Sequence, residues 1–213
     1  MSKFPCRLYI TAPAGLPCDE LTGLLDVALA DNDIAAMLYT PVNNNECADA
    51  LMGCTIAHDC AFIVADDIAL AQTLNADGVH LTGTIDSSKD LYKEARSKLG
   101  SDSMIGLSTA LNRHDSMCVG EIASTYIYFD TSIPNNHTVV EQHSLENLVS
   151  WWSDMFELPC VARAYENIEQ NRELITAGVD FLYLNNSLWT SAENAKNTLK
   201  SLTHLIAECG RKQ

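Results

Sequence analysis

The sequence lacks the features that mark membrane, disordered and secreted proteins. No apolar run approaches the roughly 18–20 residues that a membrane-spanning helix requires, so no membrane partner is expected. Glycine and proline number only 10 and 6 in 213 residues, and no stretch is of low complexity, which argues against disorder. The opening MSKFPCRLYITAPAG has no basic region followed by an apolar core, so we expect a cytoplasmic protein.

Cysteine pairs of the CxxC type are also missing. The eight cysteines are scattered along the chain, and in a reducing compartment most of them should be small buried hydrophobic residues. Cys54, His58 and Cys60 in CTIAHDC form the one Cys/His cluster. A structural zinc site would need a fourth ligand from elsewhere, so the sequence disfavours metal binding at this cluster.

Cations are scarce as well. Thirteen Lys and Arg stand against 28 Asp and Glu, giving a formal net charge of −15. Nucleic-acid binding normally requires a basic face, so this class of partner is disfavoured. A protein of such charge that handles phosphates must gather its few cations, backbone amides or a metal ion at one place.

Apolar runs alternate regularly with segments of helical period. The predicted strands are residues 6–11, 34–39, 60–65, 77–81, 103–108, 125–130, 159–164 and 180–185. The predicted helices are residues 19–30, 46–53, 67–75, 87–100, 112–123, 144–157, 167–178 and 191–209.

This alternation predicts a parallel α/β fold. Eight strand–helix units allow closure into a (βα)8 TIM barrel that takes residues 1–213 as a single domain. An open, doubly wound sheet is the alternative. Such a sheet usually has fewer units, and no glycine-rich phosphate-binding fingerprint follows the first strand here.

Polar side chains lie at the ends of two neighbouring predicted strands. Asp66 and Asp67 come directly after the third strand, and His80 lies near the end of the fourth. We expect Asp67 to cap the next helix and Asp66 to face the barrel mouth, where a carboxylate suits Mg²⁺ beside a phosphorylated substrate. Val79 and His80 cannot both face the interior. A role for His80 in the pocket and a role as a hydrogen-bonded core residue both stay open.

The segment FIVADDIALAQTLNADGVHL, residues 62–81, resembles the thiamine phosphate synthase/TenI family, which carries an ND(R/D)…ADGVHLGQED pattern on its third and fourth strands. ARSKLG…MIGLST and LITAGVDFLYL match further family segments in order. The resemblance implies a (βα)8 barrel and the Mg²⁺-dependent joining of hydroxymethylpyrimidine diphosphate to a thiazole phosphate, with loss of pyrophosphate. It therefore implies small phosphorylated pyrimidine and thiazole ligands.

The resemblance also implies roles for single residues. Asp66 and Asp86 correspond to metal ligands, although Asp86 stands one position later than the family pattern requires. Ser108, in the GxST match, is the catalytic candidate. The substrate-binding candidates are His80, Thr109, Arg163, Asn186 and Ser187.

Several phosphate-contacting groups of the family are replaced. No cation follows the second strand in residues 38–44, and the lysine expected after the sixth strand is missing from residues 133–138. Ala164 and Tyr165 replace glycines after the seventh strand, where a side chain hinders the convergence of backbone amides on a phosphate. Arg163 could supply the missing charge, or strand alternation could point it outward to a helix.

Two functions therefore stay open. The chain is a thiamine phosphate synthase with a divergent site, or it is a TenI-like or non-catalytic ligand-binding barrel. A metal bound between Asp66 and Asp86 would favour the enzyme, and an uncharged deep pocket would favour the binder. The sequence leaves the oligomeric state open, a homo-oligomer included.

Overall fold

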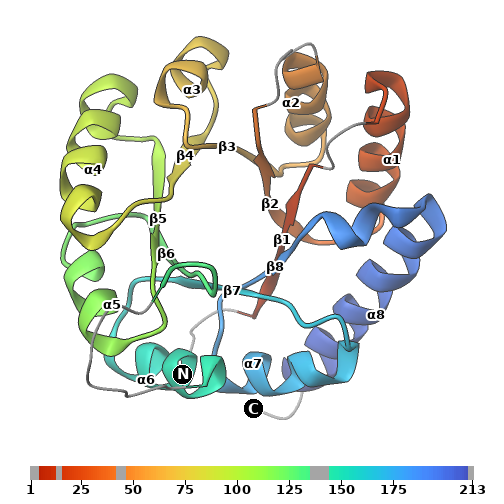
Figure 1. Ribbon diagram of the computed structural model, residues 1–213. Helices are drawn as coiled ribbons and strands as arrows, with labels where there is room; N and C mark the ends of the chain where they lie inside the picture. The colour runs from red at the N-terminus through yellow and green to blue at the C-terminus, as the bar shows by residue number, and fades with distance from the viewer. Residues whose placement is uncertain (1–4, 13–15, 42–46, 135–143, 211–213) are drawn as a thin grey trace.

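Strands and helices alternate along the whole of the described chain (Figure 1). The computed structural model describes residues 5–12, 16–41, 47–134 and 144–210. The strands are β1 (Arg7–Thr11), β2 (Ile34–Tyr39), β3 (Ala61–Ala65), β4 (Gly78–Leu81), β5 (Met104–Thr109), β6 (Tyr126–Phe129), β7 (Cys160–Arg163) and β8 (Phe181–Leu184). The helices are α1 (Cys18–Ala30), α2 (Ala48–Ala57), α3 (Ile68–Leu74), α4 (Ile85–Leu99), α5 (Arg113–Gly120), α6 (Leu145–Met155), α7 (Asn171–Ala177) and α8 (Ala192–Gly210).

All neighbouring strands are parallel, and they close into a barrel in the order β1 to β8. The helices form a ring around this barrel (Figure 1). The predicted (βα)8 barrel is therefore confirmed, and the open sheet is wrong. Among the described residues, no helix is both long and apolar enough to cross a bilayer.

The structure differs from the predicted elements at three places. Helix α2 continues past residue 53 to Ala57, so that Cys54 lies within a helix. The predicted helix over 167–178 begins as a separate 3₁₀ turn, η2 (Ile168–Gln170). A second 3₁₀ turn, η3 (Asn186–Thr190), follows β8 and was not predicted. An asparagine directly precedes each turn, Asn167 before η2 and Asn185 before η3. Its side chain accepts a hydrogen bond from the backbone amide two residues on, a local alternative to α-helix.

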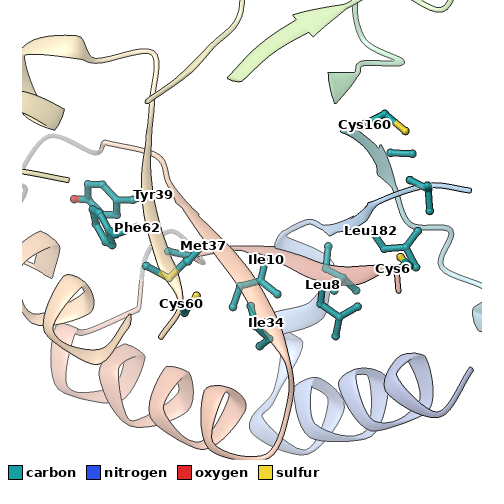
Figure 2. Close-up of a cluster of buried hydrophobic side chains, with 14 of the residues drawn as sticks. Cys6, Leu8, Ile10, Ile34, Met37, Tyr39, Cys60, Phe62, Cys160 and Leu182 are labelled. Carbon is teal, nitrogen blue, oxygen red and sulfur yellow. The ribbon is translucent and has the colours of Figure 1, made fainter. Parts of the chain in front are cut away.

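The main hydrophobic core lies between the strands and the helices. Outward-facing side chains such as Leu8, Ile10 and Leu182 are almost fully buried there, as Figure 2 shows. Cys60 and Cys160 belong to the same layer, and burial raises the pKa of the Cys60 thiol to about 12. None of the eight cysteines, all of which lie within the described residues, forms a disulfide; four of them are buried and four are half-buried. The expectation that most thiols are small buried apolar residues therefore holds for half of them.

A second, smaller cluster fills the middle of the barrel. It consists of Tyr9 of β1, Ile63 of β3, Tyr126 of β6 and Val161 of β7. Tyr126 crosses over Gly106, where a Cβ atom would lie only 2.1 Å from the Tyr126 ring. We call these four residues the dividing layer, because separate cavities open on its two sides.

Candidate functional site at the barrel mouth

A cavity of about 340 Å³ opens at the carboxyl ends of the strands. We call it the mouth cavity. Its lining brings together Asp66, His80, Ser108 and Arg163, which the sequence distributes over four strands. Asp66, which was expected at the barrel mouth, therefore lies at the same end of the barrel as Ser108 and Arg163.

The two adjacent aspartates divide as predicted. The Asp67 carboxylate accepts a hydrogen bond from Leu70 N at 2.8 Å and caps α3. Asp66 lies in the left-handed region with φ 53°, a conformation that Asp tolerates better than most residues. Its amide donates to His80 O at 2.9 Å, and its Oδ1 accepts from Thr82 N at 2.5 Å. The exposed Asp66 carboxylate is thereby held between the ends of β3 and β4.

His80 faces the interior and closes the bottom of the mouth cavity, whereas Val79 faces the helices. The His80 Nε2 atom lies 3.0 Å from Ser108 Oγ, and Nδ1 lies 3.2 Å from Tyr126 Oη. Desolvation lowers the pKa of His80 to about 4, although Asp66 and Asp130 oppose this shift. The imidazole is therefore neutral near pH 7, and each ring nitrogen has one hydroxyl partner.

Two tyrosines and an aspartate in the mouth cavity were missed by sequence reasoning. Tyr128 and Tyr183 meet edge to face with ring centroids 5.4 Å apart, and burial raises the pKa of both phenols, so they stay neutral. Asp130 Oδ1 accepts hydrogen bonds from the Ser132 amide and hydroxyl at 2.8 and 2.7 Å. Alternation in YIYFD was the available signal, since it puts Tyr126, Tyr128 and Asp130 on one face.

Arg163 ends β7 and is exposed at the mouth. It points to the cavity and not outward to a helix, which decides the alternative that the sequence left open. It also borders two further cavities beside the ends of β7 and β8. Among the described residues that line the mouth cavity, Arg163 is the one permanent cation. The site therefore combines one guanidinium with the carboxylates of Asp66 and Asp130.

The backbone amide of Tyr165 is already bonded within the chain. It donates to Asn171 Oδ1 at 2.8 Å, and Asn171 Nδ2 donates back to Tyr165 O at 3.0 Å. Asn171 is fully buried, and the Tyr165 hydroxyl donates to Glu146. An anion at this loop would have to displace a buried side-chain oxygen before it could use that amide. We call this pair the Tyr165–Asn171 lock.

The chain after β8 offers polar groups beside Arg163. Asn185 lines the mouth cavity, and its Oδ1 accepts from the Ser187 amide and hydroxyl at 3.2 and 2.7 Å. Ser187 shares the neighbouring cavity with Arg163. Asn186 is exposed and lies outside the linings of both cavities. Its role in binding stays a prediction.

Two further predicted site residues, Thr109 and Asp86, also lie away from the mouth cavity. Thr109 faces outward, is buried and donates to Ala110 O. Asp86 is exposed in the first turn of α4 and is not part of the cavity lining. Within the described ranges, no group of three or more His, Cys, Asp or Glu side chains could hold a metal ion. His58 instead pairs with Asp26 at 2.8 Å. Residues 42–44 and 135–138 of the two substituted loops lie outside the described residues.

The fold and the polar mouth define a class: TIM barrels that take small ligands at the carboxyl ends of their strands. Comparison with known families narrows this class, because residues 41–187 match the family described as thiamine monophosphate synthase, TMP-TENI. The chain belongs to this thiamine phosphate synthase/TenI family.

Individual relatives agree over most of their length. The chain is 41% identical over 205 residues to the thiamine-phosphate synthase of Erythrobacter litoralis, covering 91% of this chain and 93% of the relative. It is 30% identical over 189 residues to the thiamine-phosphate synthase of Rhodospirillum centenum, covering 86% and 89%. The solved thiamine phosphate pyrophosphorylase from Pyrococcus furiosus superposes with a TM-score of 0.70 at 19% identity, covering 95% and 96%. This last likeness concerns the fold alone.

Proposed function

We propose that the protein is a thiamine phosphate synthase, which joins hydroxymethylpyrimidine diphosphate to a thiazole phosphate at the barrel mouth. In this reaction the thiazole nitrogen attacks the methylene carbon of the pyrimidine, and the bond to the diphosphate oxygen breaks. Pyrophosphate leaves with the electron pair. The observation that carries the proposal is the convergence of Asp66, the His80–Ser108 pair and Arg163 on one cavity, in a chain of this family.

Mg²⁺ fits the donor set if substrate and water supply most of its ligands. Mg²⁺ commonly binds one or two carboxylates together with substrate phosphates. Asp66 provides an exposed carboxylate with only one oxygen hydrogen-bonded to Thr82. When bound, the ion would neutralise charge on the departing diphosphate. We assign Asp66 as its protein ligand. Asp86 has weaker support because it does not line the cavity.

We assign His80 and Ser108 to the pyrimidine end of the site. A neutral imidazole in a buried position offers a fixed donor or acceptor to its neighbour without charge. When His80 Nε2 carries the ring proton, it donates a hydrogen bond to Ser108 Oγ. The serine hydroxyl proton is then free to donate into the cavity. Tyr128 and Tyr183 add aromatic edges and faces for a flat ring. Ser108 would then direct its donor at the ring or at the leaving group.

We assign the thiazole phosphate to Arg163, with Asn186 and Ser187 as neighbouring polar groups. In the Tyr165–Asn171 lock, the Tyr165 amide donates to Asn171 Oδ1 and is therefore not available to an anion. A guanidinium binds phosphate through directed, charge-assisted hydrogen bonds. Anion binding in this protein thus depends on a side chain where the family depends on glycine amides. Thr109 is buried behind the strand, which argues for an indirect role.

One observation favours the alternative, a ligand-binding barrel without synthase turnover. Arg163 is the one permanent cation among the described residues that line the mouth cavity, whereas a departing diphosphate needs strong charge stabilisation. The two functions share ligands and differ in turnover, so one experiment separates them.

The test is to incubate the purified chain with both substrates, with and without Mg²⁺, and to measure thiamine phosphate and pyrophosphate. We expect Mg²⁺-dependent formation of both products, a loss of at least about 100-fold in Asp66→Asn, and activity close to wild type in Asp86→Asn. Equal turnover in wild type and Asp66→Asn would remove Asp66 from the mechanism. Saturable binding of both substrates without product in any condition would establish the non-catalytic alternative.

A further inference from the structure

A larger cavity, of about 560 Å³, lies on the other side of the dividing layer, at the amino ends of the strands. We call it the floor cavity. Its volume falls within the range of roughly 300–1,000 Å³ that is usual for small-molecule pockets. The interior of a TIM barrel is normally filled by side chains. An open space of this size at the amino end therefore calls for a physical explanation.

The floor cavity is hollow because small residues occupy inward positions on adjacent strands. Ala36 of β2 and Ala61 of β3 are direct neighbours in the sheet. Met104 and Phe181 also face this space. All four side chains are only half-buried, so the cavity is reached by solvent. At its rim, Ile56 is 67% exposed, an apolar side chain available for contact.

The charges around the floor cavity are unbalanced. Arg7 is already paired, because its Nη2 lies 2.7 Å from Asp33 Oδ1 and its Nε bonds the same oxygen at 2.9 Å. Asp77, a second acidic residue of this lining, accepts a hydrogen bond at Oδ2 from Phe62 N at 2.7 Å. Asp59 is exposed and, within the described part of the chain, its carboxylate has no hydrogen-bond or ion-pair partner. The chain itself carries −15, which strengthens the negative potential.

We propose that the floor cavity binds a small organic cation with an aromatic or compact apolar body. The body would lie against Phe181, Met104 and Ile63, where burial of apolar surface favours it. The cationic group would lie near Asp59 and Asp77, and the face of Phe181 offers cation–π attraction. This site is separate from the one assigned to synthesis.

The dividing layer keeps the two sites structurally distinct. Tyr9 and Val161 line both cavities, so one layer of side chains separates them. Tyr126 lines the floor cavity and bonds both Tyr9 Oη at 2.9 Å and His80 Nδ1 at 3.2 Å. A ligand at the floor would thus contact the hydroxyl network that orients His80 without entering the mouth.

The test is titration of the full chain with benzyltrimethylammonium, benzyl alcohol and benzoate, followed by protein NMR shifts and calorimetry. We expect the cation to bind at least about tenfold more tightly than the neutral probe, and the anion to bind most weakly. Asp59→Asn should remove most of this preference. Asn suits the positive φ of 54° at this position, so the variant keeps the backbone. Asp49→Asn, in the first turn of α2, is the matched control.

A second variant tests the location. Ala61→Leu places a larger side chain in the cavity and should abolish binding of all three probes. Asp66→Asn, at the mouth, should bind the cation like wild type, which separates this test from the proposed synthesis. Failure of every probe to bind, or cation binding that is unchanged in Asp59→Asn, would overturn the proposal. If Ala61→Leu does not fold, the loss or retention of the cation preference in Asp59→Asn, a variant at an exposed position, still tests the proposal.

Discussion

The two ends of this barrel differ in character although the same strands build both. Along β6 and the residue after it, the inward positions run from Tyr126 through Tyr128 to Asp130. Along β8 they run from Phe181 through Tyr183 to Asn185. In both series, polarity rises toward the carboxyl end. The mouth gathers charged and hydrogen-bonding groups, while the floor is a half-open apolar hollow with acidic residues at its rim.

This difference follows from strand geometry. Side chains two residues apart share a face but lie at different depths, so one strand can serve the two ends with separate chemistry. Residues at the mouth continue directly into loops and helix N-termini, as Asp66 and Asp67 do before α3. Residues at the floor are followed by the rest of the strand. Polar function at one end therefore does not require polar residues at the other.

The largest effect should come from the layer between the ends. Gly106→Ala would place a Cβ 2.1 Å from the Tyr126 ring. Because this ring is held by Tyr9 and His80, it cannot move without breaking buried hydrogen bonds. We expect the free energy of unfolding to fall by about 3 kcal/mol, measured by urea denaturation.

Two further variants make this result specific. Gly23→Ala, on α1 with nothing within 4 Å of the added Cβ, should raise stability by up to about 1 kcal/mol. Adding Tyr126→Leu to Gly106→Ala should recover part of the loss. A Gly106→Ala protein as stable as wild type would show that the dividing layer rearranges at no cost and does not divide the interior.

The next largest effect concerns the mouth side of this layer and depends on pH. The pKa of His80 is about 4 in the folded protein, below an ordinary value near 6.5, so between these values the unfolded chain binds more protons. This contribution to stability is complete above about pH 6.5 and is lost as the pH falls toward 4, by about 3 kcal/mol in total. His80→Gln should lack it. If the free energy of unfolding of wild type and of His80→Gln changed in parallel from pH 7.5 to 4.5, the argument that burial lowers the pKa of His80 would be contradicted.

The fold was predictable because periodicity alone specifies it. Strands of four to six residues separated by helical segments leave few alternatives to a parallel sheet, and eight units close it. The mouth was partly predictable, since residues at strand ends must lie there. Placing Asp66, Ser108 and Arg163 at this end needed no knowledge of register, but the direction of the Arg163 side chain did.

Contacts that depend on register or on distant segments were not predictable. In YIYF either face of β6 is apolar enough to point inward, and only pairing of Tyr126 with Gly106 determines which one does. The Tyr165–Asn171 lock joins a loop to a residue that the helical pattern treats as one more polar position. The floor cavity arises where Ala36 and Ala61 meet across two strands, which no single segment reveals.

The third test compares the arginines at the two ends. Arg163→Ala should weaken binding of thiazole phosphate by about 10- to 100-fold, equivalent to 1.5–3 kcal/mol, because charge-assisted hydrogen bonds are lost. Arg7→Ala, at the floor, should leave this affinity unchanged. Calorimetry at fixed salt measures both. Tyr165→Gly should not improve binding, since its amide stays bonded to Asn171. Tight binding that survives Arg163→Ala would mean that a backbone cradle persists.

The smallest effect separates the two adjacent aspartates at the mouth. Asp67→Ala removes the side chain that accepts from Leu70 N at 2.8 Å, and loss of such an N-cap costs about 1 kcal/mol. Its carboxylate does not line the mouth cavity, so turnover and Mg²⁺ dependence should match wild type at a temperature where both proteins are folded. Asp66→Asn should show the reverse, with activity lost and the thermal midpoint little changed. Denaturation and product formation measured on the same preparations give both quantities. If Asp67→Ala lost activity out of proportion to its stability, the cap would also position Asp66, and the division of the pair into one structural and one functional carboxylate would be wrong.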